Sequence, residues 1–137
     1  MLLLMFFKIY LYFITFIFFQ ACTDFITTAA TLLSSPINAF LATVEHSSTV
    51  PLMESCRNVV SDTSQRISNK LPGIKKSMRL YLANVDTEAI LFRPIRGQIL
   101  LQFSELRKVI DTLDEEDRFI INCPSPEQLT LTLTYDH

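Results

Sequence analysis

Apolar residues recur at helical spacing along most of the chain after Gln20. One run follows the i, i+3, i+4, i+7 template of an amphipathic helix: Ile37, Phe40, Leu41 and Val44. The clearest stripe has gaps of 4, 4, 3, 4 and 3 residues, which keep its members on one helix face: Ile95, Ile99, Phe103, Leu106, Ile110 and Leu113. These patterns predict an all-α fold of short amphipathic helices.

Prolines are expected to divide these helices. The Ser34-Ser35-Pro36 step is typical of a helix that stops and restarts, because serine caps helices and proline suits the first turn. Leu71-Pro72-Gly73 is expected to end the next helix. Arg93-Pro94 is expected to interrupt the one after it, since proline disfavours helix at the residue before it. Asp86-Thr87-Glu88 is a candidate N-cap cluster for that segment.

The last third of the chain contains two short candidate helices. The acidic run 114–117 fits either a linker or the first turn of a helix, where the helix dipole favours carboxylates. Ser125-Pro126-Glu127-Gln128 matches a capping box with proline at the first helical position. The leucines that follow alternate with threonines, as in a strand, so 129–135 stays open between helix and strand.

Residues 1–19 form a separate hydrophobic leader in which only Lys8 and Thr15 are polar. As a helix the leader would extend about 28 Å, close to the roughly 30 Å of a bilayer's hydrocarbon core. A membrane helix is one interpretation, although Lys8 inside the run costs about 2.5–3.5 kcal/mol unless it snorkels. After Lys8, no Lys or Arg follows until Arg57, so the positive-inside rule gives almost no orientation. A signal-like segment is a second interpretation, although no charged region precedes the apolar run.

Composition argues against several classes of protein. Only two glycines occur, which disfavours glycine-rich phosphate loops and dinucleotide folds. The net charge of −2 gives no general attraction to nucleic acid. Three widely separated cysteines, Cys22, Cys56 and Cys123, favour free thiols over a disulfide framework. The two histidines, His46 and His137, have no zinc-ligand spacing and no nucleophile beside them, so we predict no catalytic residue, metal site or cofactor.

Two groups of residues are candidates for contacts with other molecules. Lys75, Lys76 and Arg79 form a candidate basic contact face for anionic lipid or an acidic partner, or simply a solvated polar face. The stripe from Ile95 to Leu113 is a candidate interface seam. As a bare pattern it belongs to a core, but a chain this short can leave part of that core for a partner to complete.

Residues 71–96, LPGIKKSMRLYLANVDTEAILFRPIR, resemble the carboxyl-terminal part of subunit 3 of the conserved oligomeric Golgi complex. The resemblance is carried by the Leu-Pro step, then Ser-Met-x-Leu-Tyr-Leu, Asp-Thr-Glu and Ile-Leu-Phe-x-Pro-Ile-Arg. It continues in Glu116-Asp117, Ile120-Ile121, Cys123-Pro124-Ser125 and Glu127-Gln128-Leu129. The match is dense between 71 and 129 and fades back towards Gln20.

The resemblance implies that 20–137 is a helical-bundle or rod region of the multisubunit tethering-complex type, without catalytic or cofactor residues. It implies action in retrograde vesicle transport within the Golgi, peripherally on the cytosolic face of the membrane. Expected partners are the other subunits of the complex, and SNAREs, small GTPases and vesicle coat are further expected partners. Family members are several-fold longer, so the chain is expected to be a fragment. A third interpretation of residues 1–19, beside the membrane helix and the signal-like segment, is that they are non-coding sequence translated in a gene model. Their richness in phenylalanine motivates it. The alternative function is a small adaptor with 1–19 as a true membrane anchor.

Overall fold

A computed structural model describes residues 1–46, 53–82 and 84–134. Within these ranges the chain forms helices and no strand, which confirms the all-α prediction. Three long helices are followed by two short ones. They are α1 Leu2–His46, α2 Met53–Tyr81, α3 Val85–Ile110, α4 Glu115–Ile121 and α5 Pro126–Thr132.

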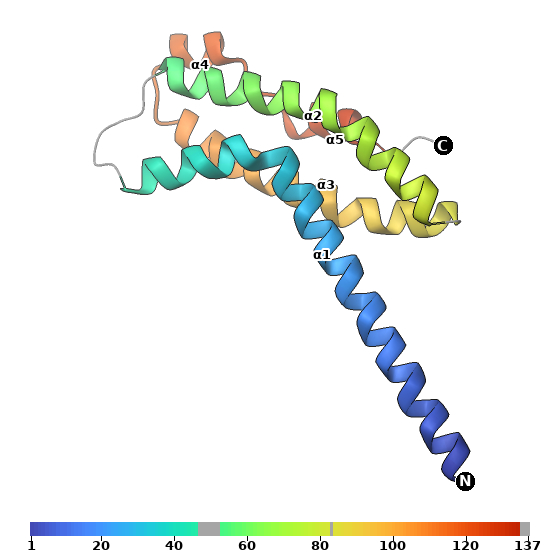
Figure 1. Cartoon of the computed structure of the whole chain (residues 1–137). Helices are drawn as coiled ribbons and strands as arrows, with labels where there is room; N and C mark the ends of the chain where they lie inside the picture. The colour runs from blue at the N-terminus through green and yellow to red at the C-terminus, as the bar shows by residue number, and fades with distance from the viewer. Residues whose placement is uncertain (47–52, 83, 135–137) are drawn as a thin grey trace.

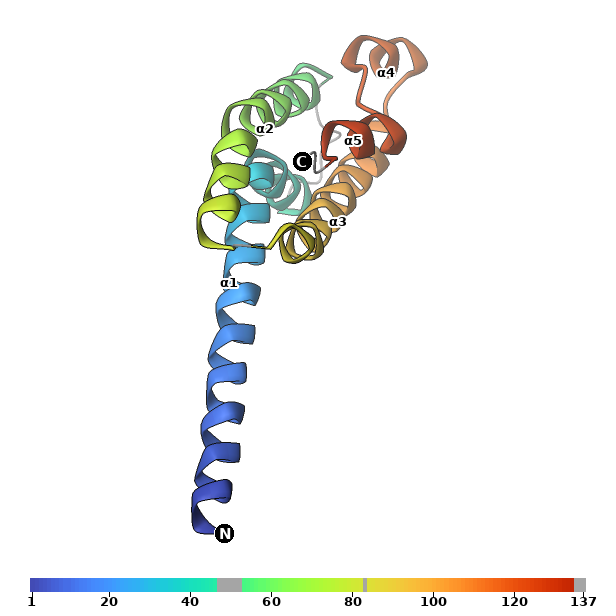
Figure 2. The same cartoon turned by 90° about the vertical axis from the view of Figure 1, so that its right-hand side faces the viewer.

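The helices form a small bundle with one long projection. The C-terminal half of α1 lies against both α2 and α3, while α4 packs on α2 and α5 packs on α3 (Figure 1). The N-terminal half of α1 leaves this bundle as a straight rod, and both views show it free of the other helices (Figures 1 and 2). The hydrophobic leader is therefore continuous with the first bundle helix.

The core is built from matching stripes on α2 and α3. Both stripes have gaps of 4, 3, 4, 4, 3 and 4 residues, so each keeps one face towards the bundle, as in coiled coils. The α2 stripe is Cys56, Val60, Thr63, Ile67, Leu71, Ile74 and Met78. The α3 stripe is Glu88, Phe92, Ile95, Ile99, Phe103, Leu106 and Ile110. Leu33 and Ile37 of α1 are fully buried in the same cluster.

The three proline breaks expected from the sequence are wrong, because Pro36, Pro72 and Pro94 all lie inside continuous helices. Proline in a helix interior costs about 3 kcal/mol, mainly through the lost hydrogen bond and a clash with the carbonyl four residues back. Pro72 and Pro94 lie on the exposed side of their helices, where water can reach that carbonyl. Burial of the stripes on both sides of each proline then keeps the helix continuous.

Pro36 is half-buried, and the hydrogen bond that it cannot donate is replaced by one from another residue. The carbonyl that Pro36 cannot engage is that of Leu32. Arg66 of α2 donates to this Leu32 oxygen at 3.1 Å. Beside it the Ser34 hydroxyl donates to the Ala30 carbonyl at 2.7 Å, a bond that often bends helices. α1 bends in this part of its length, where it meets the bundle (Figure 1).

The helix ends follow local capping chemistry. The α3 cap is Asn84 and not the Asp86-Thr87-Glu88 cluster, because the Asn84 side chain accepts from the backbone N–H groups of Asp86 and Thr87. The acidic run provides the first turn of α4. The Ser125–Gln128 capping box is confirmed, with Pro126 opening α5. The tail is thus helical to Thr132, and residue 135 lies outside the described residues.

Candidate membrane and subunit contact surfaces

The candidate interface seam lies inside this chain's own core. Five of its members are between 0% and 3% exposed: Ile95, Ile99, Phe103, Leu106 and Ile110. Leu113 follows the end of α3 and is half-buried against the same cluster. The stripe is covered by α1 and α2, so in this fold it is an internal contact surface.

The candidate basic contact face is divided by the fold. Lys75 turns towards the bundle, where its Nζ donates to the Thr134 carbonyl at 2.9 Å and lies 5.6 Å from the centre of the Phe92 ring. These contacts join α2 to the end of α5 and to α3. Lys76 and Arg79 are exposed. Lys75 thus has a structural role that its position in the sequence did not indicate.

Arg107 makes a similar internal connection at the other end of the bundle. Its guanidinium donates to the carbonyl of Pro124 and so holds the segment between α4 and α5 against α3. Burial raises the pKa of the neighbouring Cys123 thiol, while the Arg107 guanidinium lowers it in part. Burial also raises the pKa of Cys56. All three cysteines are free thiols.

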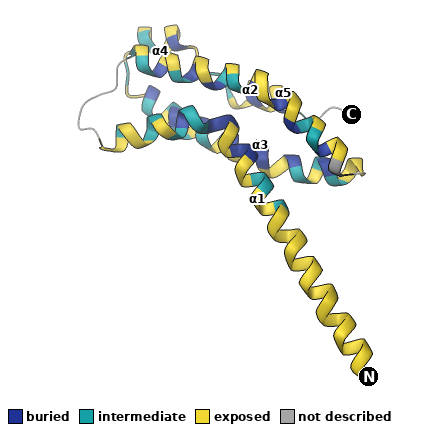
Figure 3. Ribbon diagram, viewed as in Figure 1, coloured by how far each residue is buried: buried dark blue, intermediate teal, exposed yellow. Residues whose placement is uncertain are grey.

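The rod is the most exposed apolar surface of the molecule. Every residue from Met1 to Ala21 is exposed, and Figure 3 shows this half of α1 in one colour. An 18-residue window of α1 has a mean hydropathy of 2.2 and is 0% buried, so by length and composition this helix could cross a membrane. Single apolar side chains are ordinary on a protein surface, but a continuous surface of this kind marks a membrane or partner contact.

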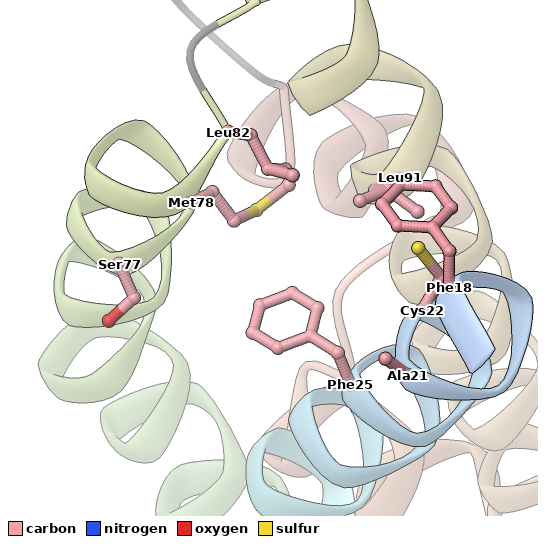
Figure 4. A pocket seen from close by; sticks show the side chains of 8 residues that line it. All are labelled: Phe18, Ala21, Cys22, Phe25, Ser77, Met78, Leu82 and Leu91. Atoms are coloured by element: carbon pink, nitrogen blue, oxygen red, sulfur yellow. The ribbon is translucent and has the colours of Figure 1, made fainter. Parts of the chain in front are cut away.

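A pocket of about 250 Å³ lies at the root of the rod, where α1 enters the bundle. Its walls come from α1, the end of α2 and the start of α3, and they are almost wholly apolar: Phe18, Ala21, Cys22, Phe25, Ser77, Met78, Leu82 and Leu91. The Phe25 ring points towards Met78, and the Ser77 hydroxyl points away from the space (Figure 4). Sequence reasoning missed this pocket, since its wall residues come from three separate stretches of the chain.

The described residues bring together no group of three His, Cys, Asp or Glu side chains that could hold a metal ion. The acids of the 114–117 run stay at the start of α4, where Asp117 is half-buried and the others are exposed.

Comparison with known proteins agrees with this architecture. A family model described as the COG3 C-terminal cap domain matches residues 49–135, more than half of the chain. The chain belongs to the COG3 cap family. The matched residues, which we term the cap region, contain α2 to α5, and the whole of α1 lies before them.

Curated relatives match about half of the chain. The conserved oligomeric Golgi complex subunit 3 of Homo sapiens is 47% identical over 68 residues, which are 49% of this chain and 8% of that protein. The subunit of Mus musculus is 42% identical over 78 residues, or 56% of this chain and 10% of its own length. The subunit of Aedes aegypti is 39% identical over 79 residues, or 56% of this chain and 9% of its own. The chain thus spans about a tenth of the length of these relatives. No solved structure matches.

Proposed function

We propose that the chain is a non-catalytic helical component of the conserved oligomeric Golgi complex that works through contacts between subunits. The match of the cap region to the COG3 family is the observation that carries this proposal. The stripes of α2 and α3 support it, because their apolar members are buried and hold the bundle together. The proposed process is retrograde vesicle transport within the Golgi and the maintenance of Golgi organisation.

The proposed partners are the other subunits of the complex, with SNAREs, small GTPases and vesicle coat acting through the assembled tether. The proposed location is the cytosolic face of the Golgi membrane, bound peripherally. Since the seam is internal, subunit contacts fall to side chains that the bundle leaves outside. Phe119 of α4 and Leu131 of α5 are 85% and 78% exposed and are the first candidates.

Affinity capture of the tagged chain from Golgi-containing cells tests this proposal. We expect the other tether subunits to be enriched, and Phe119→Asp with Leu131→Asp to reduce the enrichment at unchanged chain abundance. Residues 1–46 fused to a fluorescent protein are the control, because they carry the apolar rod without the cap region. Equal capture by this fusion, or no tether subunit with the intact chain, would contradict the proposal.

A second function is favoured by the exposure of the rod: a small membrane-anchored helical adaptor with residues 1–19 as a true anchor. The rod is strongly apolar and exposed from Met1 to Ala21, so it is stable in a bilayer and costly to keep in water. Alkaline carbonate extraction separates the two functions, since an anchored chain stays with the membrane and a peripheral one is released.

The third interpretation of residues 1–19, translated non-coding sequence, makes a different prediction about the endogenous product. An antibody against residues 71–137 would then detect a protein several-fold heavier than 15.7 kDa and no band near that mass. A clean band at the mass of this chain would exclude the artefact and leave the leader as part of the protein.

A further inference from the structure

Charge is distributed unequally between the two ends of the bundle. Residues 75–96, at the end of α2 and the start of α3, contain five Lys or Arg and two acids; we call them the basic end. Residues 105–118, at the end of α3 and the start of α4, contain six acids and three Lys or Arg. These two regions lie at opposite ends of α3, which places cationic and acidic surfaces far apart on one small bundle (Figure 1).

The basic end lies beside the root of the rod. The pocket walls show this directly, because Phe18 and Cys22 of α1 line the same space as Leu82, after α2, and Leu91 of α3. Figure 4 shows these side chains around one space that is shared by α1, the end of α2 and the start of α3. The basic end is distant from the leader in sequence, and the fold brings its helix ends to the root of the rod.

The side chains at this end combine charge with exposed apolar surface. Lys76 and Arg93 are exposed, on α2 and α3 respectively. Leu80, Val85 and Ile90 lie around the same turn and are 71%, 50% and 62% exposed. Lysine and arginine near apolar side chains suit the boundary of a bilayer, where the cations meet lipid headgroups and the apolar groups enter the region beneath them.

We propose that the basic end is a membrane-facing surface that binds the headgroups of an anionic bilayer in which the rod is inserted. The inference rests on the second function above, the membrane anchor, and adds to it the side of the bilayer and the lipid class. Anionic lipid attracts basic residues near a membrane helix and is concentrated in cytosolic leaflets, so the bundle lies on the cytosolic side. The acidic end, on the other side of the bundle, faces away from the bilayer.

The position of the basic end favours a lipid surface over an acidic protein as its binding partner. A cationic surface immediately beside an exposed helix of bilayer length is already at the headgroup level once that helix is inserted. Attraction of about 1 kcal/mol per Lys or Arg is available there without any further partner. An acidic protein would have to compete with the lipid for the same cations.

Partition of the full chain into vesicles tests the proposal. The chain is diluted from detergent into phosphatidylcholine vesicles with or without phosphatidylserine, at limiting lipid, and the floated fraction is measured at low and high salt. We expect partition on the order of tenfold stronger into the phosphatidylserine vesicles, with the difference reduced by salt. The variant Lys76→Glu with Arg93→Glu should abolish that difference.

The matched control is Arg57→Glu with Arg118→Glu. Both residues are exposed and lie towards the other end of α2 and on α4. Each double variant changes the net charge from −2 to −6, so only the position of the charges differs. Retention of the lipid preference by the control and its loss in the Lys76/Arg93 variant support the proposal. Equal loss in both variants, or no preference in the unaltered chain, overturns it.

Carbonate washing of the floated vesicles separates this inference from the anchor itself. A chain that stays in both vesicle types without a lipid preference retains the anchor and overturns the lipid contact. A chain that is washed from both, yet shows the preference and its dependence on Lys76 and Arg93, overturns the anchor and retains the contact. Circular dichroism of each variant verifies that the helices are intact.

Discussion

The bond between Arg66 and the Leu32 carbonyl gives the most specific stability prediction. Pro36 cannot donate to this carbonyl, and Arg66 of α2 fills the position from 3.1 Å. Arg66→Met keeps most of the side chain and removes the donor. Pro36→Ala restores a backbone N–H, which then bonds to Leu32 and makes Arg66 dispensable. The two substitutions should therefore be coupled.

The size of the coupling follows from the surroundings of the bond. A hydrogen bond to a charged donor contributes about 1.5–3 kcal/mol when buried. Arg66 is half-buried and Leu32 is 39% exposed, so water partly replaces the lost donor. We expect Arg66→Met to lower the free energy of unfolding by about 0.5–1 kcal/mol in the native background and by close to zero beside Pro36→Ala.

Urea unfolding of the full chain in mild detergent, followed by circular dichroism, measures the four free energies of this cycle. Gln65→Met is the control, because Gln65 is an exposed neighbour of Arg66 on the same helix. It should have the same small effect in both backgrounds. An equal cost of Arg66→Met with and without Pro36 would refute the interpretation that Arg66 completes the helix at the proline.

Three further predictions concern the core. Phe103→Ala should lower the free energy of unfolding, measured in urea, by about 3–5 kcal/mol, because Phe103 is 1% exposed. Leu101→Ala is the control and should change it by less than about 0.5 kcal/mol, because Leu101 is 58% exposed. Similar costs for the two variants would show that the seam is not internal. Thr63→Val should stabilise the chain by about 1 kcal/mol in the same assay, since the buried Thr63 hydroxyl has no hydrogen-bond partner among the described residues, and a loss of stability would reveal a bond to that hydroxyl. Burial raises the pKa of Cys56 in the folded state, so its contribution to stability is present below the ordinary thiol pKa of about 8.5 and declines as pH rises through the higher folded value. The thermal midpoint should fall less between about pH 7 and about pH 10, roughly 1.5 units on either side of that value, in Cys56→Ala than in the native chain. An equal fall would place the alkaline instability elsewhere.

Local patterns predicted the elements that depend on nearby residues. The apolar stripe after Ile95 and the capping box at Ser125 need only a helix a few turns long, and both are present as expected. The proline breaks failed for the opposite reason. Whether a helix continues through proline depends on burial of the stripe on both sides and, at Pro36, on Arg66, which is 34 positions from the carbonyl it contacts.

The candidate contact residues were found in the sequence, but their roles were not. Lys75, Lys76 and Arg79 are neighbours on one helix, yet only the fold turns Lys75 towards Thr134 and Phe92. The seam was recognised as a stripe, yet a stripe carries no information about which helix covers it.

The amino-acid order alone specified an all-helical chain with a bilayer-length apolar start and relatives in a Golgi complex, because hydrophobic periodicity and residue identity are local properties. Tertiary structure decided that the stripes close on one another and that the start continues as a bundle helix. It also brought the end of α2 and the start of α3 to the root of the leader, around one apolar pocket. Packing joins residues far apart in the chain, and that pairing depends on which faces remain to be buried once each helix has formed.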